Sequence, residues 1–450
     1  MSHFTSKKGV IIRGAFILTL TGFLSRFIGF FYRVFLSQTF GEEGVGLYQL
    51  IFPIYALCYS LTVAGIETAL SRAVASKVSL GKEQEAKQLL YVALGVSVFF
   101  SAVITCILQA NASWAAKHIL LDVRCAPLLV AMSYSFPFSA IHSCICGYCF
   151  GLKQTGIPAI AQLVEQTARV AAVYIIYLVA LKKSFTIDIT FAVLGLVFGE
   201  ITSSFFCVKA FSRNRKKGQI RSLNFRIYRQ RFRELIPMSV PLTANRILLN
   251  LLQSIEAISI PARLQMSGLN TEEALSIYGV LTGMALPCIL FPSAITNSIS
   301  TMMLPTVAEI QTASNTSRLS AMIRKVTGCC FLLGVCCCVG FLALGQWMGT
   351  FLFHSESAGK FIVTLAWICP FQYMNSTLIS MVNGLGKTTV SFLVNSIGLL
   401  LRIGSVMLLI PVYGIIGYLW GLLGSQICVS LLCILYLSNY IRTSKKMEQA

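Results

Sequence analysis

Residues 89–109 read LLYVALGVSVFFSAVITCILQ and contain no charged side chain. A run of about 20 apolar residues is long enough to cross the hydrocarbon core of a bilayer as a helix. The segment is apolar on every face, whereas a strand of a membrane barrel alternates apolar and polar residues over about ten positions. It therefore predicts a transmembrane helix and excludes an outer-membrane barrel.

Similar segments recur along the whole chain. The 450 residues are 56% hydrophobic and only 12% charged, with a mean hydropathy of +0.76, whereas soluble domains carry about 25% charged residues. Hydropathy windows of about 19 residues predict an all-α integral membrane protein with about twelve transmembrane helices. The predicted spans are 15–36, 46–70, 89–109, 126–150, 158–181, 187–210, 236–260, 276–303, 327–346, 361–382, 389–411 and 414–438.

The basic residues orient these spans. Most of the 36 Lys and Arg fall in segments that are cytoplasmic if the N-terminus is cytoplasmic. Cytoplasmic loops of membrane proteins carry such an excess of Lys and Arg, so we expect both termini in the cytoplasm. The net charge of +20 then reflects topology and attraction to anionic lipids. No basic segment accompanies a soluble recognition module, so no nucleic-acid partner is expected.

The sequence also contains a weak internal repeat. An offset of 233 residues aligns 137–169 with 370–402, and the identities include Pro137 with Pro370, Gly151 with Gly384 and Arg169 with Arg402. Coincidence between apolar helices is the alternative explanation. A true repeat predicts two six-helix lobes, 1–211 and 236–450, with the same topology. Parallel repeats of this kind are typical of transporters with the substrate path between the lobes.

The predicted lobes are joined by a basic segment, 212–235. It carries nine Lys and Arg from Ser212 to Arg233, and Ile220, Leu223 and Ile227 recur at helical spacing within it. This pattern predicts a helix lying on the cytoplasmic face of the membrane. A solvated segment that only sets the topology is the alternative.

Charged side chains within the predicted spans are candidates for function, because an ionisable group at bilayer depth costs at least about 2.5 kcal/mol. Glu165 and Arg169 stand at i, i+4, which predicts a structural ion pair on one helix. Arg402 has Gly398 in the corresponding position, so it must either find a partner elsewhere or extend to a membrane interface. The full set is Arg26, Arg33, Glu67, Glu165, Arg169, Glu200, Arg246, Glu256 and Arg402.

Arginines without an acid within one turn on their own helix are predicted to bind substrate. Arg26, Arg33 and Arg246 offer forked donors that match phosphate oxygens, and Asn245 stands beside Arg246. The alternatives are that these arginines extend to the membrane surface or pair with Glu67 or Glu256. These two glutamates are also the candidates for coupling transport to Na⁺ or H⁺.

The sequence offers no cofactor site and no catalytic constellation. Cys144, Cys146 and Cys149 project in different directions around a helix, so no metal site is expected, and the 16 cysteines are expected to act as small apolar residues. The intramembrane His142 is predicted to donate a hydrogen bond between helices. An integral-membrane enzyme would need a nucleophile or an acid–base pair near an interface, and the sequence shows none.

Four segments together resemble stage V sporulation protein B-like membrane proteins. These belong to the multidrug/oligosaccharidyl-lipid/polysaccharide exporter superfamily, which includes lipid II flippases. The segments are GAFILTLTGFLSRFIGFFYRVFLSQTFGEEGVGLY (14–48), GYCFGLKQTGIPAIAQLVEQTARV (147–170), YGVLTGMALPCILFPSAITNSISTMMLP (278–305) and NGLGKT (383–388).

The resemblance implies a flippase that carries undecaprenyl-pyrophosphate-linked glycans, such as a peptidoglycan precursor, across the bacterial cytoplasmic membrane. Arg26 fits the family's first-span arginine and Arg33 its later basic residue, whereas Arg246 has no clear counterpart. Membrane lipids and cell-wall synthesis proteins are the implied partners. A cation-coupled multidrug exporter of the same fold is the alternative, although a pump for cationic drugs would favour acidic rather than basic groups.

Overall fold

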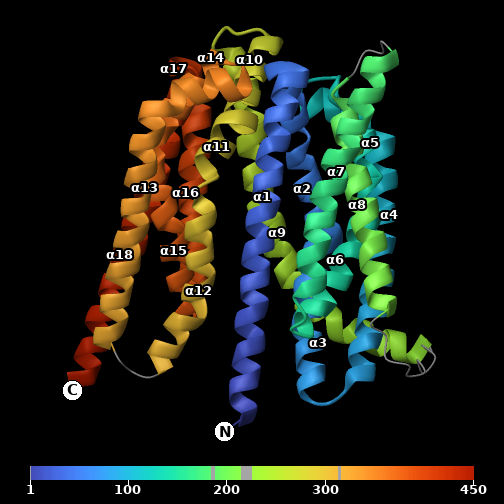
Figure 1. Ribbon diagram of the computed structural model, residues 1–450, viewed down its shortest axis with the longest axis vertical. Coiled ribbons are helices and arrows are strands. Elements are labelled where there is room, and N and C mark those ends of the chain that lie inside the picture. Colours follow the sequence, from blue (N-terminus) through green and yellow to red (C-terminus); the bar gives the residue numbers. More distant parts are fainter. Residues whose placement is uncertain (1, 184–187, 214–224, 313–315, 450) are drawn as a thin grey trace. The chain divides into compact units, whose positions relative to one another are not determined.

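The computed structural model describes residues 2–183, 188–213, 225–312 and 316–449, and all regular elements in these ranges are helices (Figure 1). The chain divides into two compact units. Unit 1 comprises Met1–Tyr32 and Leu50–Ser254, and unit 2 comprises Arg33–Gln49 and Ile255–Ala450. The lobe boundaries expected from the sequence, 1–211 and 236–450, stay a prediction.

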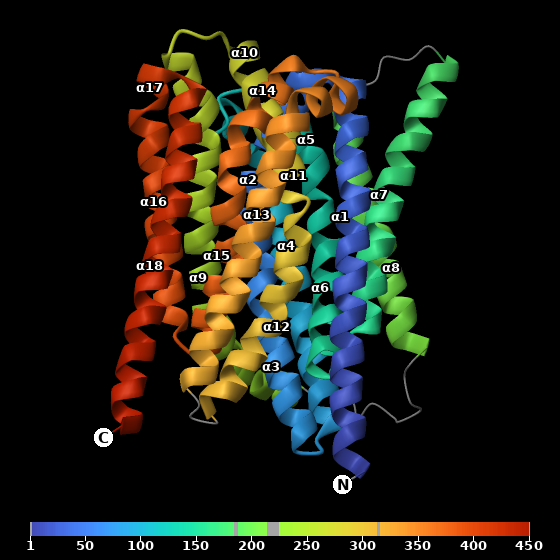
Figure 2. The same ribbon diagram turned by 60° about the vertical axis from the view of Figure 1, so that its left-hand side comes forward.

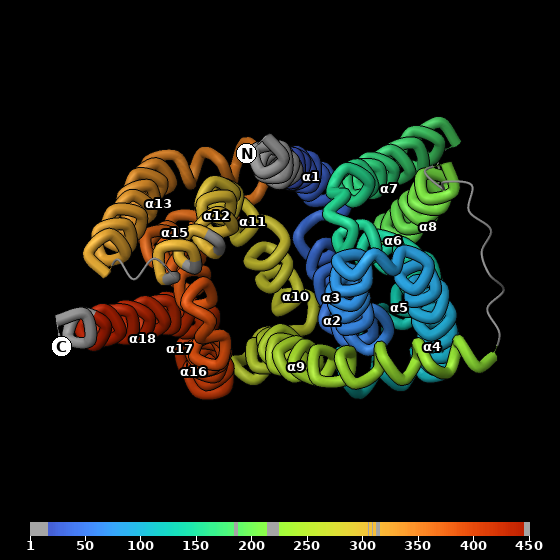
Figure 3. The backbone as a smooth tube through the Cα atoms, turned by 90° about the horizontal axis from the view of Figure 1, so that it is seen from below, coloured from blue at the N-terminus to red at the C-terminus, as the bar shows by residue number. Residues whose placement is uncertain are grey.

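In unit 1, α7 lies along α8, and α6 packs against α3, α4 and α8, as Figure 3 shows along the helices. Buried Leu, Ala and Val side chains of α3 and α4 form its largest apolar cluster. Its helices are the first part of α1 (Ser2–Leu50), α2 (Phe52–Tyr59), the π-helix η1 (Ser60–Ala64), α3 (Gly65–Ser79), α4 (Glu83–His118), α5 (Cys125–Ser133), α6 (Ser135–Gly151), α7 (Gly156–Lys183), α8 (Thr190–Arg213) and most of α9 (Phe225–Met266).

In unit 2, α15 packs against α12, α13 and α18, and α16 lies beside α18 (Figure 2). Its helices are α10 (Thr271–Gly279), the π-helix η2 (Val280–Ala285), α11 (Leu286–Leu290), α12 (Ser293–Thr312), α13 (Thr316–Phe353), α14 (Glu356–Leu365), the 3₁₀ turn η3 (Ala366–Ile368), α15 (Cys369–Gly384), α16 (Thr388–Leu408), α17 (Ile410–Tyr413) and α18 (Ile415–Gln449).

Local sequence explains several helix boundaries. At Gly41 within α1 the backbone leaves helical geometry with φ 70°, a value that glycine adopts without a Cβ clash. The amide of Glu273 donates to the side chain of Asn270, and the Glu273 carboxylate accepts from the Asn270 amide. This capping box satisfies two free amides and begins α10.

The protein is a multi-pass membrane protein. Nine described helical segments are long and apolar enough to span a bilayer, or ten if the bent pair α5 and α6 forms one span. The prediction of about twelve differs for two reasons. The run Ile17–Ser79 is counted once but covers the predicted spans 15–36 and 46–70, and the predicted span 361–382 is broken by η3. Each predicted span therefore lies in a helical segment.

The repeat predicted from the sequence is confirmed by the helix positions. α4 begins at Glu83 and α13 at Thr316, and α6 ends at Gly151 and α15 at Gly384, both 233 residues apart. The turns that follow α6 and α15 both contain a residue in the left-handed region, Lys153 with φ 60° and Gly386 with φ 75°. The two halves of the chain therefore repeat their turn geometry as well as their helix order.

The predicted basic linker lies partly outside the described residues. Residues 214–224, which include Ile220 and Leu223, are not described, whereas 225–235 belong to α9 and carry Ile227. The described part of the linker is thus continuous with a long helix.

Candidate functional site

Polar side chains of α2 and α6 contact a buried carboxylate on α8, that of Glu200. The hydroxyl of Tyr55 on α2 donates to Glu200 Oε1 over 3.3 Å, and His142 Nδ1 on α6 lies 3.5 Å from Glu200 Oε2. Glu200 is buried, with 6% of its surface exposed. A buried carboxylate requires such partners, because leaving it unpaired at membrane depth is costly.

Close packing of α7 against α8 places a second carboxylate beside this group. A Cβ on Gly199 would lie 2.9 Å from the carbonyl oxygen of Glu165, and one on Gly195 would lie 2.2 Å from a methyl carbon of Val173. Small residues let helix backbones approach closely in membranes. Arg169 Nη2 donates to Glu165 Oε1 over 2.5 Å, so the i, i+4 pair expected from the sequence is present.

Glu67 forms a second arm of the unit 1 network. It lies in the first turn of α3, directly after the π-helix η1, and π-helical turns often occur at functional sites. Tyr59, Arg246 and His142 interact with Glu67 electrostatically. The hydroxyls of Tyr59 and Ser143 lie 2.9 Å apart, which continues the polar contacts towards α6.

The approach of α9 to η1 brings Arg246 near Glu67. A Cβ on Gly65 would lie 1.8 Å from Thr243 Oγ1, and Asn250 Nδ2 donates to the Ala56 carbonyl over 3.2 Å. Any side chain larger than glycine at position 65 would separate these helices.

The predicted substrate-binding residues differ in their surroundings. Arg26, Asn245 and Arg246 are exposed residues of unit 1, and Arg33 is half-buried in unit 2 with an interaction of its own. The ion pairs found among the described residues do not include Arg26 or Arg246. Arg246 nevertheless lies near the coupling candidate Glu67 and acts on it electrostatically.

In unit 2, the other coupling candidate is tied to two helices. Glu256 on α9 lies 3.4 Å from Arg402 Nε on α16, and Tyr418 on α18 donates to Glu256 Oε1 over 2.8 Å. Arg402 is thus paired with an acid on another helix, which is one of the two possibilities that the sequence left open. Glu256 is buried, with 6% of its surface exposed. Its negative charge is balanced by the permanent positive charge of Arg402.

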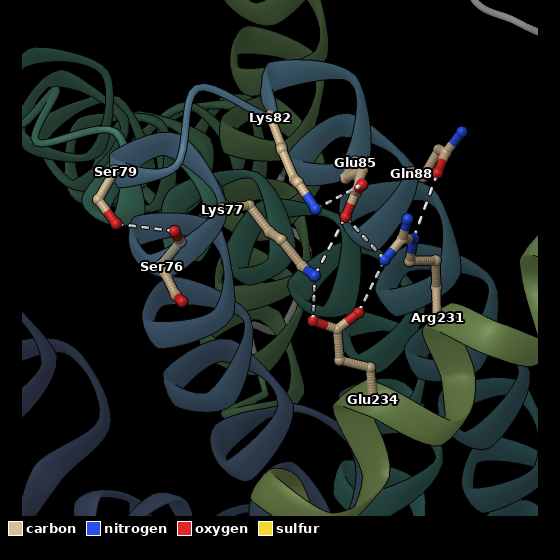
Figure 4. A network of polar contacts seen from close by, with 8 residues as sticks. All are labelled: Ser76, Lys77, Ser79, Lys82, Glu85, Gln88, Arg231 and Glu234. Atoms are coloured by element: carbon tan, nitrogen blue, oxygen red, sulfur yellow. Dashed lines mark hydrogen bonds and ion pairs between the residues drawn. The ribbon is translucent and has the colours of Figure 1, made fainter.

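A separate ion network joins the ends of α3, α4 and α9 in unit 1 (Figure 4). Lys77 Nζ lies 2.7 Å from Glu234 and 3.1 Å from Glu85, and Arg231 Nη1 lies 3.0 Å from Glu85 and 2.9 Å from Glu234. Two cations thus alternate with two carboxylates. The network anchors the beginning of α9, which leads to Asn245 and Arg246.

Sequence reasoning did not assign roles to Tyr55 and Glu200, and gave His142 only a helix–helix hydrogen bond. One signal was available, because His142 and Cys146 stand at i, i+4 and share a helix face. Their partner Cys207 on α8 comes from a distant segment, and His142, Cys146 and Cys207 each place a ligand atom within 4.8 Å of the others.

With this geometry established, comparisons identify the family. The family model for polysaccharide biosynthesis proteins matches residues 11–311. The chain belongs to this family. It is 27% identical to stage V sporulation protein B of Bacillus subtilis over 447 residues, covering 98% of this chain and 86% of the relative. It is also 23% identical to the lipid II flippase MurJ of Bacillus subtilis over 376 residues, covering 77% of this chain and 66% of that protein.

Solved structures agree on the fold. A lipid II flippase MurJ in an inward closed conformation superposes with a TM-score of 0.73 at 14% identity, covering 94% of this chain and 87% of that one. An inward-facing multidrug transporter of the MATE family, from the MOP superfamily, gives 0.68 at 14% identity, covering 94% and 96%. The predicted MOP-type helical fold is therefore confirmed.

Proposed function

We propose that this protein is a flippase that moves an undecaprenyl-pyrophosphate-linked glycan across a bacterial cytoplasmic membrane. Family membership and the similarity to a lipid II flippase support the proposal. The observation that carries it is that two arginines within the predicted spans, Arg26 and Arg246, are exposed, whereas the glutamates within the same spans are buried or half-buried (Glu67, Glu165, Glu200 and Glu256). Such a surface favours an anionic substrate over a cationic drug.

In this proposal the pyrophosphate is held by Arg26, Asn245 and Arg246 of unit 1, and Arg33 of unit 2 stays a candidate substrate residue within its own unit. A guanidinium offers parallel donors that match two phosphate oxygens at once. Arg246 is the best placed of these residues, because it also interacts electrostatically with Glu67. Substrate binding at Arg246 would weaken the hold of this arginine on Glu67.

We further propose that Glu67, rather than Glu256, responds to the coupling ion, Na⁺ or H⁺. Glu67 is half-buried and interacts electrostatically with the candidate substrate residue Arg246. Glu256 faces Arg402, whose fixed charge opposes a second cation. The turn between α3 and α4 lies at the same end of unit 1 as the start of α1 (Figure 1), so a cytoplasmic N-terminus places the network of Figure 4 on the cytoplasmic side.

The test is flipping of a fluorescent lipid-linked pyrophosphate glycan in proteoliposomes, followed by quenching of the outer leaflet. A hydrogen bond to a charged group contributes about 1.5–3 kcal/mol, and each 1.4 kcal/mol is a factor of about ten. We therefore expect Arg26→Ala and Arg246→Ala each to slow flipping by about 10- to 100-fold.

The matched control is Arg213→Ala, which removes an exposed arginine at the end of α8 and should flip at the wild-type rate. Wild-type flipping by both Arg26→Ala and Arg246→Ala would refute the binding site. A folded protein that is inert towards pyrophosphate-linked glycans but exports a fluorescent cation would instead support the multidrug exporter.

A further inference from the structure

A cluster of soft ligands lies where α6 packs on α8. His142 and Cys146 are one helical turn apart on α6, and Cys207 is on α8. One ligand atom from each lies within 4.8 Å of the other two. Cys146 is 5% exposed and Cys207 is fully buried, so both thiols are shielded from solvent. The proposed flippase uses none of these three side chains.

We propose that His142, Cys146 and Cys207 form a binding site for a divalent metal ion of the zinc class. Zinc binds cysteine sulfur at about 2.3 Å and histidine nitrogen at about 2.0–2.1 Å, so its ligand atoms lie about 3.5–3.8 Å apart. The ligand atoms here are at most 4.8 Å apart. Side-chain rotations that move these atoms by about 1 Å would bring them to the separations of a zinc site.

Charge balance favours this metal inside a membrane. Binding converts the two thiols to thiolates and releases two protons, so a divalent cation with two thiolates and a neutral imidazole carries no net charge. A neutral complex avoids the cost of burying an unbalanced ion at this depth. Thiolate sulfur also selects zinc-class metals over Mg²⁺ or Ca²⁺, which prefer oxygen.

The carboxylate of Glu200 lies beside the ring nitrogen of His142 that would not bind the metal. Glu200 Oε2 lies 3.5 Å from His142 Nδ1, and Tyr55 donates to the other oxygen of the same carboxylate. Ligating histidines commonly donate their second ring N–H to a carboxylate, which fixes the tautomer and orients the ring. The arrangement leaves Nε2 of His142 for the metal.

A second grouping shares the histidine but is less suited to a cation. His142, Glu165 and Glu200 also place ligand atoms within 4.8 Å of one another. However, Arg169 is bonded to Glu165, and its permanent positive charge repels a metal ion. The carboxylates that act electrostatically on the thiols are Glu200 for Cys207 and Glu67 for Cys146, and negative neighbours favour a cation on the sulfur side.

Bound metal would fasten α6 to α8 within unit 1. Cys207 lies six residues before the end of α8 at Arg213, and Cys146 lies five residues before the end of α6 at Gly151. A ligand that binds only the folded state stabilises it. Metal removal should therefore lower the melting temperature of the protein.

The test uses the full chain, purified in detergent under a phosphine reductant and loaded with Co²⁺ as a spectroscopic stand-in for zinc. We expect thiolate-to-cobalt charge-transfer absorption in the near ultraviolet, reversed by added Zn²⁺, and about one zinc per chain by elemental analysis. This measurement on the unaltered protein does not depend on any variant folding.

Variants then assign the ligands. Cys146→Ser with Cys207→Ser, and separately His142→Ala, should abolish the absorption and the bound zinc. Cys144→Ser is the matched control, because its thiol is buried on the same helix but donates to Ser97 Oγ on α4 over 3.4 Å; it should retain both. Glu165→Gln should also retain the thiolate band.

Three results would overturn the proposal. These are absence of thiolate absorption in the reduced wild-type protein, retention of zinc by the double serine variant, and a disulfide between Cys146 and Cys207 that persists under the reductant.

Discussion

The ion pair between Glu256 and Arg402 makes a quantitative prediction. The Glu256 side chain is 8% exposed and the Arg402 side chain 26% exposed. Removing one partner of a buried pair costs about 3–5 kcal/mol, because the other charge is left uncompensated. In Arg402→Met the carboxylate keeps the hydrogen bond from Tyr418 and the site is partly open. We therefore expect a loss of about 2 kcal/mol in the free energy of unfolding.

The double variant tests the cause of this loss. Adding Glu256→Gln to Arg402→Met removes the stranded charge, so it should restore about 1 kcal/mol relative to Arg402→Met alone. Equilibrium unfolding in mixed micelles, followed by tryptophan fluorescence, measures each free energy and yields the coupling energy of the pair. Arg442→Met, at an exposed arginine near the end of α18, is the control and should change stability by less than about 0.5 kcal/mol.

Additive losses would refute this reasoning. If Arg402→Met and Glu256→Gln together cost the sum of their separate effects, the two side chains do not interact. Glu256 would then be free to bind a coupling ion, and the preference for Glu67 would lose its main support.

Two further predictions concern unit 1. Gly65→Ala places a Cβ 1.8 Å from Thr243 Oγ1 and should cost about 1–3 kcal/mol by overpacking, measured by thermal unfolding. In the control Gly404→Ala the new Cβ meets no atom within 4 Å, so this variant should be tolerated. Equal effects of the two substitutions would contradict the close approach of the helices at Gly65. Glu234→Gln removes a carboxylate that pairs with Lys77 and should lower the free energy of unfolding by about 0.5–1 kcal/mol at low salt. This loss should shrink at high salt, because salt screens the ion pair. A loss of stability that does not depend on salt would contradict an electrostatic origin.

The sequence predicted features that depend on neighbours along the chain. The spans follow from local hydropathy, and the pair Glu165–Arg169 follows from helix periodicity alone. The repeat was visible because identities such as Gly151 with Gly384 recur at a constant offset. These features require no knowledge of which helices pack together.

Contacts between distant segments could not be predicted in this way. Glu256 and Arg402 were both singled out by their depth, but no spacing rule pairs α9 with α16. The same holds for Glu200, whose partners Tyr55 and His142 come from α2 and α6. The break of the predicted span 361–382 at η3 did have a local signal, because Pro370 stands in the first turn of α15 directly after η3.

The repeat-related arginines show where the two units diverge. Arg169 is neutralised by Glu165 on its own helix, whereas Arg402 draws Glu256 from α9. In unit 1 this leaves Glu200 to face His142, and Glu67 to face the exposed Arg246, so its acids meet groups that can change their charge or engage a substrate. In unit 2 the acid of α9 is held by a permanent cation. Because Glu256 in unit 2 is paired with Arg402, we expect the ion dependence of transport to be changed by Glu67→Gln and not by Glu256→Gln.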